Sequence, residues 1–149
     1  QVISVSGDGG LSMLMGELVT ARMHNLPIKV VVFNNSSLNF VELEMKASGF
    51  VTTATGLGSH DLAAIATACG MRGYRVTASD QLESVMRQAF AEPGPALIDV
   101  RVERQELTIP PSVKLSQAKG FALYAMRTLL SGRGDELVEL TKANARQII

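Results

Sequence analysis

The sequence has few features that would support a disulfide framework, a membrane span or a nucleic-acid interface. Its one cysteine, Cys69, excludes an internal disulfide. No apolar run approaches the roughly 18 residues that a membrane-spanning helix needs. Lys and Arg together number 14, as do Asp and Glu, so the formal net charge is zero and nucleic acid is not expected as a partner. We therefore expect a soluble, cytoplasmic domain.

The length and hydrophobic content suit one compact domain. The chain has 149 residues, of which 46% are hydrophobic, enough to form a real core but few for two domains. Its first residues, Gln1 to Ser6, have the pattern of a strand from the first position on, and they include neither a starting Met nor a signal peptide. We therefore expect the chain to be an N-terminally truncated part of a longer protein.

Short apolar runs alternate with helical patterns in the first two thirds of the sequence. Strands are expected at 2–6, 28–33, 74–76 and 96–102, and helices from near Leu11 and over 61–69 and 80–91. The run at 28–33 is nearly all apolar, as in a strand that is buried on both faces of a parallel sheet. The pattern predicts an α/β fold with a doubly wound parallel sheet flanked by helices.

The character of the sequence changes after Val102. Charged residues and then Pro110-Pro111 cannot continue a central strand and indicate an extended connector. A helix with one apolar face follows over 118–130, Gly132 and Gly134 interrupt it, and a last amphipathic helix is expected from Asp135 toward Ile149. We therefore expect a cofactor-binding domain at 1–102 and a connector with a helical tail at 103–149.

Gly7-Asp8-Gly9-Gly10 follows the first expected strand and precedes a helix. Open α/β sheets bind ligands at the carboxyl ends of their strands. The glycines permit close approach of the backbone, and the helix directs free N–H groups toward the same place, which suits a phosphate. Asp8 would repel that phosphate unless a cation lay between them. The sequence therefore predicts a metal here.

Asn34-Asn35 follows the second strand. If the two strands are neighbours, their carboxyl ends lie about 5 to 10 Å apart, which one ion can bridge. Carboxylate, amide and phosphate oxygens suit Mg²⁺ or Ca²⁺ and do not suit zinc, which prefers Cys or His. We set the other candidates aside: His60 lies where a helix cap would be, and Cys69 is expected to be a buried apolar residue.

Gly-Asp-Gly, followed after 24 residues by Asn-Asn, resembles the signature of thiamin-diphosphate enzymes in content and spacing. The resemblance implies that Asp8, Asn35 and the backbone carbonyl of Ser37 bind Mg²⁺. It also implies that Gly7, Gly9 and Gly10 contact the cofactor, with the Gly9 and Gly10 N–H groups donating to the diphosphate. Phe40, in the loop after the metal ligands, would border the reactive ring or belong to the core. Asn39 departs from the family pattern, in which a glycine is expected.

Longer runs resemble the pyruvate:quinone oxidoreductase branch, the flavin-containing pyruvate oxidases. They include Gly7 to Glu17, Val32 to Ser36 and Leu107 to Pro111. The resemblance implies oxidative decarboxylation of pyruvate to acetate and CO₂, with FAD and then a quinone as electron acceptors. It places the activating glutamate and the FAD site in other domains of the polypeptide, so this chain alone is expected to be inactive and to hold no catalytic residue of its own.

The same resemblance implies partners beyond the substrate. It indicates a homo-oligomer, expected to be a tetramer, and a C-terminal amphipathic helix that lies on the inner face of the cell membrane.

Two alternatives to this function stay open. Another thiamin-diphosphate enzyme, such as acetolactate synthase or a 2-keto-acid decarboxylase, would share the metal motif, and a non-catalytic flavodoxin-like module would use Asp8 for another purpose.

Overall fold

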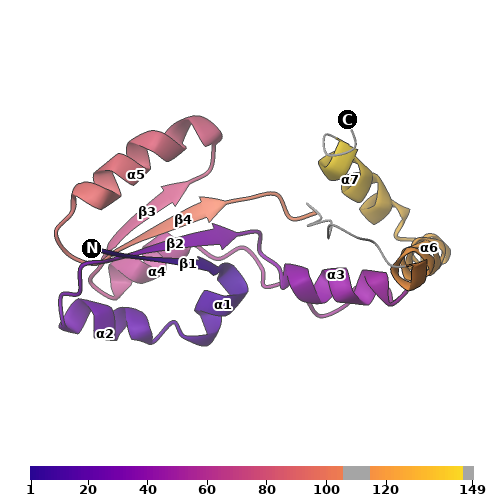
Figure 1. Cartoon of the computed structure of the whole chain (residues 1–149), viewed down its shortest axis with the longest axis horizontal. Helices are drawn as coiled ribbons and strands as arrows, with labels where there is room; N and C mark the ends of the chain where they lie inside the picture. The colour runs from indigo at the N-terminus through magenta and orange to yellow at the C-terminus, as the bar shows by residue number, and fades with distance from the viewer. Residues whose placement is uncertain (106–114, 146–149) are drawn as a thin grey trace. The chain divides into compact units, whose positions relative to one another are not determined.

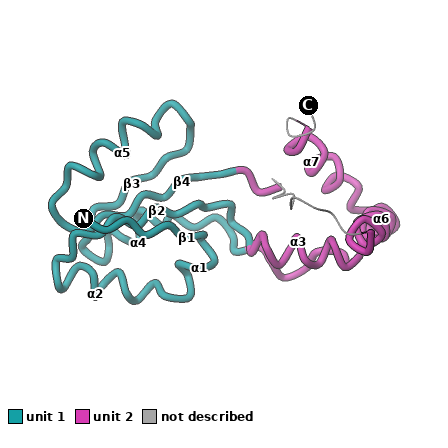
Figure 2. The backbone as a smooth tube through the Cα atoms, viewed as in Figure 1, with its two compact units in different colours: residues 1–37, 57–102 teal, residues 38–56, 103–149 magenta. Residues whose placement is uncertain are grey.

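The computed structural model describes residues 1–105 and 115–145, which belong to two compact units. The first unit comprises 1–37 and 57–102, and the second comprises 38–56 and 103–149 (Figure 2). Residues 38–56 thus belong to a different unit from the residues on either side of them, and the assignment of 1–102 as a cofactor-binding domain stays a prediction. Pro110 and Pro111 of the expected connector, and Ile148 and Ile149, lie outside the described residues.

The first unit is built on a sheet of four parallel strands (Figure 1). The strands are β1 (Val2–Gly7), β2 (Ile28–Asn34), β3 (Arg72–Val76) and β4 (Ala96–Arg101), in the order β1-β2-β4-β3. The register pairs Gly7 of β1 with Phe33 of β2. Asp8 and Asn34 therefore leave the sheet from adjacent strand ends, and the predicted doubly wound α/β fold is confirmed.

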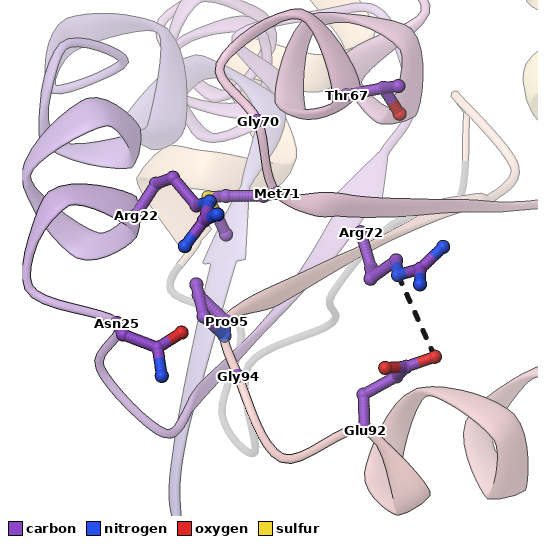
Figure 3. Close-up of a pocket in the computed structure, with 9 residues that line it drawn as sticks. All are labelled: Arg22, Asn25, Thr67, Gly70, Met71, Arg72, Glu92, Gly94 and Pro95. Carbon is purple, nitrogen blue, oxygen red and sulfur yellow. Dashed lines mark ion pairs between the residues drawn. The ribbon is translucent and has the colours of Figure 1, made fainter.

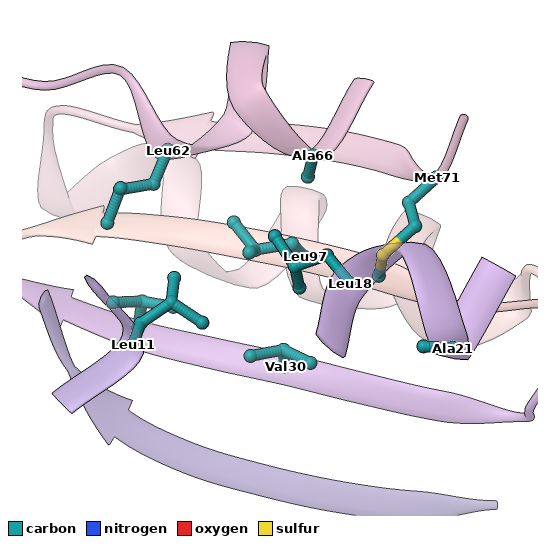
Figure 4. Close-up of a cluster of buried hydrophobic side chains, with 9 residues drawn as sticks. Leu11, Leu18, Ala21, Val30, Leu62, Ala66, Met71 and Leu97 are labelled. Atoms are coloured by element: carbon teal, nitrogen blue, oxygen red, sulfur yellow. The ribbon is translucent and has the colours of Figure 1, made fainter. Parts of the chain in front are cut away.

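Helices cover both faces of this sheet and position two apolar layers. They are α1 (Asp8–Met13), α2 (Glu17–Met23), α4 (Leu62–Ala68) and α5 (Leu82–Ala91), with a 3₁₀ turn η1 at Ser79–Gln81. One layer joins α1, α2 and α4 to the sheet (Figure 4) through Leu11, Leu18, Val30, Val32, Leu62 and Leu97. The other joins α5 to the opposite face through Val31, Ala89, Ala96, Ile98 and Val100. Alternate residues of β2 and β4 thus enter opposite layers, which explains the continuous apolar runs.

The helix that we expected from near Leu11 differs from the observed one. It begins three residues earlier, at Asp8, and is interrupted after Met13 before α2 begins at Glu17. The helix start was expected too late because Gly9 and Gly10 have low helix propensity, so nothing in the sequence indicated a helical first turn there. Gly9 and Gly10 therefore lie within the first turn of α1.

The second unit consists of α3 (Asn39–Ala47), α6 (Leu115–Leu130) and α7 (Gly134–Asn144). The expectation that Phe40 lies in a loop was wrong, because Phe40 is in the first turn of α3. Buried polar contacts hold the unit together. Glu42 and Lys46 of α3 are 1% and 2% exposed and lie 3.7 Å apart, and Arg104 lies 2.8 Å from Glu42. Within the described ranges, no helix is long and apolar enough to cross a membrane.

The last helix, α7, is docked within the second unit by its first turn. Glu136 accepts hydrogen bonds from Tyr124 at 2.7 Å and from Thr52 at 2.8 Å, and it forms a salt bridge of 2.7 Å with Arg133. Burial and the hydrogen bond to Glu136 raise the pKa of Tyr124 well above its usual value. Near the end of α7, Asn144 donates to the carbonyl of Gln105 at 2.7 Å. In this structure α7 therefore packs on its own unit.

Candidate functional site

Asp8 is the first residue of α1 and directly follows the carboxyl end of β1. Only 7% of the residue is exposed. Within the described part of the chain, its carboxylate makes no hydrogen bond and no salt bridge. Burying a carboxylate without a partner is unfavourable, and a bound cation would remove that penalty. The cation that the sequence led us to expect at this position stays a prediction, to which the low exposure of Asp8 lends physical support.

The backbone around Asp8 is arranged as an open helix N-terminus. Gly7 precedes α1 as its N-cap, with φ of −83° and no side-chain capping hydrogen bond. The first N–H groups of a helix have no acceptor within the helix and suit an anion. A Cβ added at Gly7 would meet nothing within 4 Å, whereas one at Gly10 would lie 3.1 Å from Ser6 Oγ. The space in front of Gly7 is therefore open for a ligand.

The turn at Asn34 to Ser37 follows β2 and has a constrained backbone. Ser36 has a φ of +61°, a left-handed conformation that is uncommon for serine. Side chains of the same turn support it, since the Asn34 Oδ1 accepts from the Ser36 N–H at 3.2 Å and the Asn35 Oδ1 accepts from the Ser37 N–H at 3.0 Å. Leu57 N–H donates to the Ser36 carbonyl at 2.9 Å. The turn is thus held from both sides.

Asn34 and Asn35 have different environments. Asn34 is 1% exposed, and its amide is surrounded by partners in the protein, which include Asp99 and Arg101 on β4. Asn35 is partly exposed, and its one described side-chain contact is the local hydrogen bond from Ser37. An amide oxygen has a second lone pair that can bind a metal ion. Asn35 is therefore the better ligand candidate of the two.

The donors Asp8, Asn35 and the Ser37 carbonyl match a hard divalent cation. Carboxylate, amide and carbonyl oxygens are the ligands that Mg²⁺ and Ca²⁺ prefer. Among the described residues there is no group of three or more His, Cys, Asp or Glu side chains that could hold a metal ion alone. The residues present leave coordination positions for a ligand's own oxygens, as Mg²⁺ bound with a phosphate requires. They therefore fit Mg²⁺ with a diphosphate.

A cavity of about 50 Å³ is lined by Asp8, Asn34, Met15, His60 and Leu62. The expectation that His60 caps a helix was wrong. Asp61 is the N-cap of α4, accepting from Ala64 N–H at 2.8 Å, while its other oxygen lies 2.7 Å from Arg75. The hydrogen bond from Ala64 and then the contact with Arg75 lower the pKa of Asp61. His60 is therefore a neighbour of Asp8 that its sequence context did not reveal.

A larger cleft, of about 420 Å³, lies at the amino ends of β3 and β4 (Figure 3). Its lining residues include Arg22, Asn25, Gly70 and Pro95, and also Arg72 and Glu92, which form an ion pair with a separation of 3.8 Å. Ligands of open α/β sheets bind at the carboxyl ends of strands, which is the opposite end. The smaller cavity beside Asp8, and not this cleft, is therefore at the candidate site.

Phe40 belongs to the second unit, and 76% of it is exposed. It is thus not a core residue within its own unit. The interpretation that it borders the cofactor's ring stays a prediction.

A family comparison assigns the chain to a class. Residues 1–100 match the model of the thiamine pyrophosphate enzyme family, C-terminal TPP binding domain, and thiamine pyrophosphate is another name for thiamin diphosphate. The match covers more than half of the chain, which therefore belongs to this family.

Individual relatives agree with that class. The chain is 36% identical, over 98% of its length and 25% of the relative's, to YdaP of Bacillus subtilis (strain 168), named as a candidate thiamine pyrophosphate-containing protein. It is 36% identical, over 80% of its length and 21% of the relative's, to the acetolactate synthase of the same organism. A thiamine diphosphate-dependent 4-hydroxybenzoylformate decarboxylase from Rhodococcus jostii RHA1 has a similar structure, with a TM-score of 0.65 and 25% identity over 69% of this chain and 20% of the other. The chain thus spans about a quarter or less of each of these relatives.

Proposed function

We propose that this chain binds the diphosphate of thiamin diphosphate through Mg²⁺, with Asp8, Asn35 and the Ser37 carbonyl as its ligands. The observation that carries the proposal is Asp8, a residue that is only 7% exposed and whose carboxylate has no partner among the described residues. The adjacent N–H groups of Gly9 and Gly10 would donate to the diphosphate. When bound, the cofactor supplies the carbanion chemistry, and the protein supplies binding and orientation.

We further propose that the whole protein oxidises pyruvate to acetate and CO₂ and passes the electrons to FAD and then to a quinone. The similarity to YdaP supports a branch distinct from acetolactate synthase, because it extends over 98% of this chain, including the helices after residue 102, while the acetolactate synthase match covers 80%. FAD would be bound by a domain outside this chain. The proposal also includes assembly as a homotetramer and peripheral association with the inner face of the membrane.

The test is anaerobic mixing of the full-length protein with pyruvate, Mg²⁺ and thiamin diphosphate. Bleaching of a bound flavin spectrum, dependent on both pyruvate and Mg²⁺, is the expected result. A protein without flavin, or a flavin that pyruvate does not reduce, would refute pyruvate oxidation while leaving cofactor binding intact.

Acetolactate synthase activity is the second candidate, favoured by 36% identity to the Bacillus subtilis enzyme and 33% identity over 118 residues to a Nicotiana tabacum acetolactate synthase. The same protein, supplied with pyruvate alone, would then form acetolactate without net oxidation. Acetolactate accumulation in place of acetate would decide for this candidate.

A further inference from the structure

The buried carboxylate of Asp99 lies on the strand next to Asn34. Asp99 is in β4 and is completely buried, with 0% of the residue exposed. Its Oδ1 accepts from Asn34 Nδ2 at 2.9 Å, and its Oδ2 accepts from the Leu62 N–H at the start of α4 at 3.2 Å. Among the described residues it forms no salt bridge. A buried charge that is satisfied only by these donors is expensive to keep, which indicates a role that an apolar residue could not fill.

Arg101 completes the arrangement from the end of the same strand. Its guanidinium donates to Asn34 Oδ1 at 2.8 Å and to Ser36 Oγ at 2.9 Å. The register explains this convergence, because Arg101 is the direct partner of Asn34 across the sheet and Asp99 is two residues earlier on the same face. Asn34 is thus held by an anion at its amino group and by a cation at its carbonyl oxygen.

Charge assistance makes both hydrogen bonds stronger than neutral ones and fixes which way the Asn34 amide points. With that orientation fixed, Asn34 Oδ1 can accept the Ser36 N–H and so support the left-handed Ser36. Asn35 lies between these two residues. The direction of the Asn35 side chain is therefore set by the residues that fix Asn34 and Ser36.

We propose that Asp99 and Arg101 are positioning residues that hold the Asn34–Ser37 turn ready for a divalent cation, an inference that rests on the proposed function. Neither side chain binds the ion. They act through Asn34, whose amide has no remaining freedom to rotate. The turn would then take its ion-binding form before the cofactor arrives, and the orientation of Asn35 would depend on the charge pair behind it.

The test measures Mg²⁺-dependent binding of thiamin diphosphate by calorimetry, and the melting temperature, in the full-length protein. Asp99 accepts from Asn34 Nδ2 and from the Leu62 N–H, and Asp99→Asn replaces one of its two acceptor oxygens with an amino group that can only donate. Arg101→Gln removes the positive charge beside Asn34 Oδ1. Outer residues of metal sites typically contribute about 10- to 100-fold to affinity, and a loss of that size is expected for each variant. The double variant Asn34→Asp with Asp99→Asn restores a hydrogen bond of reversed direction. It loses the contact of Asn34 with the His60 carbonyl, 3.3 Å away, so it should recover part of the loss.

Lys29→Met is the matched control. Lys29 is equally buried, at the opposite end of β2, where it donates to the carbonyls of Glu92 and Gly94 at 2.7 and 2.6 Å. This variant should lower the melting temperature and leave affinity unchanged. Wild-type affinity in both Asp99→Asn and Arg101→Gln, or losses in the double variant that simply add, would overturn the positioning role. If Asp8→Asn also kept wild-type affinity, the proposed function itself would fail.

Discussion

Replacing Asp8 with Asn should have opposite effects on the free and the loaded protein. The residue is 7% exposed and its carboxylate has no partner among the described residues, so the ligand-free protein carries the cost of a charge that is only partly hydrated. Such a penalty is about 1 to 3 kcal/mol, and more for a charged group. Because asparagine removes the charge but leaves an unpaired amide, Asp8→Asn should raise the free energy of unfolding of the ligand-free protein by a part of that penalty, about 1 kcal/mol.

The loaded protein should show the reverse order. A ligand present at about 1,000 times its Kd adds about 4.1 kcal/mol to the stability of a protein that binds it. Wild type should gain this increment from Mg²⁺ with thiamin diphosphate, whereas Asp8→Asn should gain little, because the ion loses its one charged protein ligand. The variant is thus more stable than wild type in EDTA and less stable with cofactor.

Thermal unfolding of the full-length protein, with and without Mg²⁺ and thiamin diphosphate, measures both effects. Asp80→Asn is the control, because Asp80 is an exposed aspartate and its replacement should change neither measurement. Equal stabilisation of wild type and Asp8→Asn by the cofactor would refute the metal assignment. A ligand-free Asp8→Asn protein that melts below wild type would show that Asp8 has a structural partner.

Three further predictions concern the glycines, the tyrosine and the tail. Gly7→Ala should leave the ligand-free melting temperature unchanged and weaken cofactor binding measured by calorimetry. Gly16→Ala is the control, because its Cβ would also meet nothing within 4 Å, and it should change neither quantity. Equal cofactor affinities of wild type and Gly7→Ala would mean that the diphosphate binds elsewhere. Since burial keeps Tyr124 protonated in the folded state, its contribution to stability is fully present below about pH 10, the usual pKa of tyrosine, and is lost as pH rises above it. Tyr124→Phe should flatten that alkaline loss in pH-dependent unfolding, and an unchanged slope would contradict the burial argument. Deleting residues from Asp135 onward, or replacing the exposed Val138 with Asp, should abolish pyruvate-stimulated co-sedimentation with liposomes while activity with a soluble acceptor survives; undiminished co-sedimentation would leave α7 as a docked helix only.

The strands and the metal motif could be predicted because their residues follow simple rules. The run from Ile28 to Phe33 is apolar since both faces of β2 are buried, and the observed strand extends it by one residue. Asp8 and Asn35 could be singled out as candidate ligands because polar residues directly after apolar strands are conspicuous. The pairing of β1 with β2 places the two candidates at adjacent strand ends.

Other features were hidden because their cause is tertiary. In helix α3, Glu42 and Lys46 are buried and Phe40 is exposed, which is the reverse of what the hydrophobicity of these residues predicts. Its charged residues are stabilised by partners distant in sequence, such as Arg104. Asp99 is a polar residue within an apolar strand, and its hydrogen bond with Asn34 depends on the pairing of β4 with β2, which the sequence does not show.

The buried polar contacts at the two ends of β2 also specify strand register. A shift of β2 against β4 by two residues would keep every apolar side chain on its own face, so hydrophobic burial opposes such a slip only weakly. A shift that carries Asn34 away from Asp99 would nevertheless break their hydrogen bond, and a shift in either direction would move Lys29 away from the carbonyls of Glu92 and Gly94. Lys29 and Asn34 have opposite parity along β2 and so lie on opposite faces of the sheet. Misregistered pairings of the central strands would leave buried polar groups without partners, so they would be less stable than the native pairing.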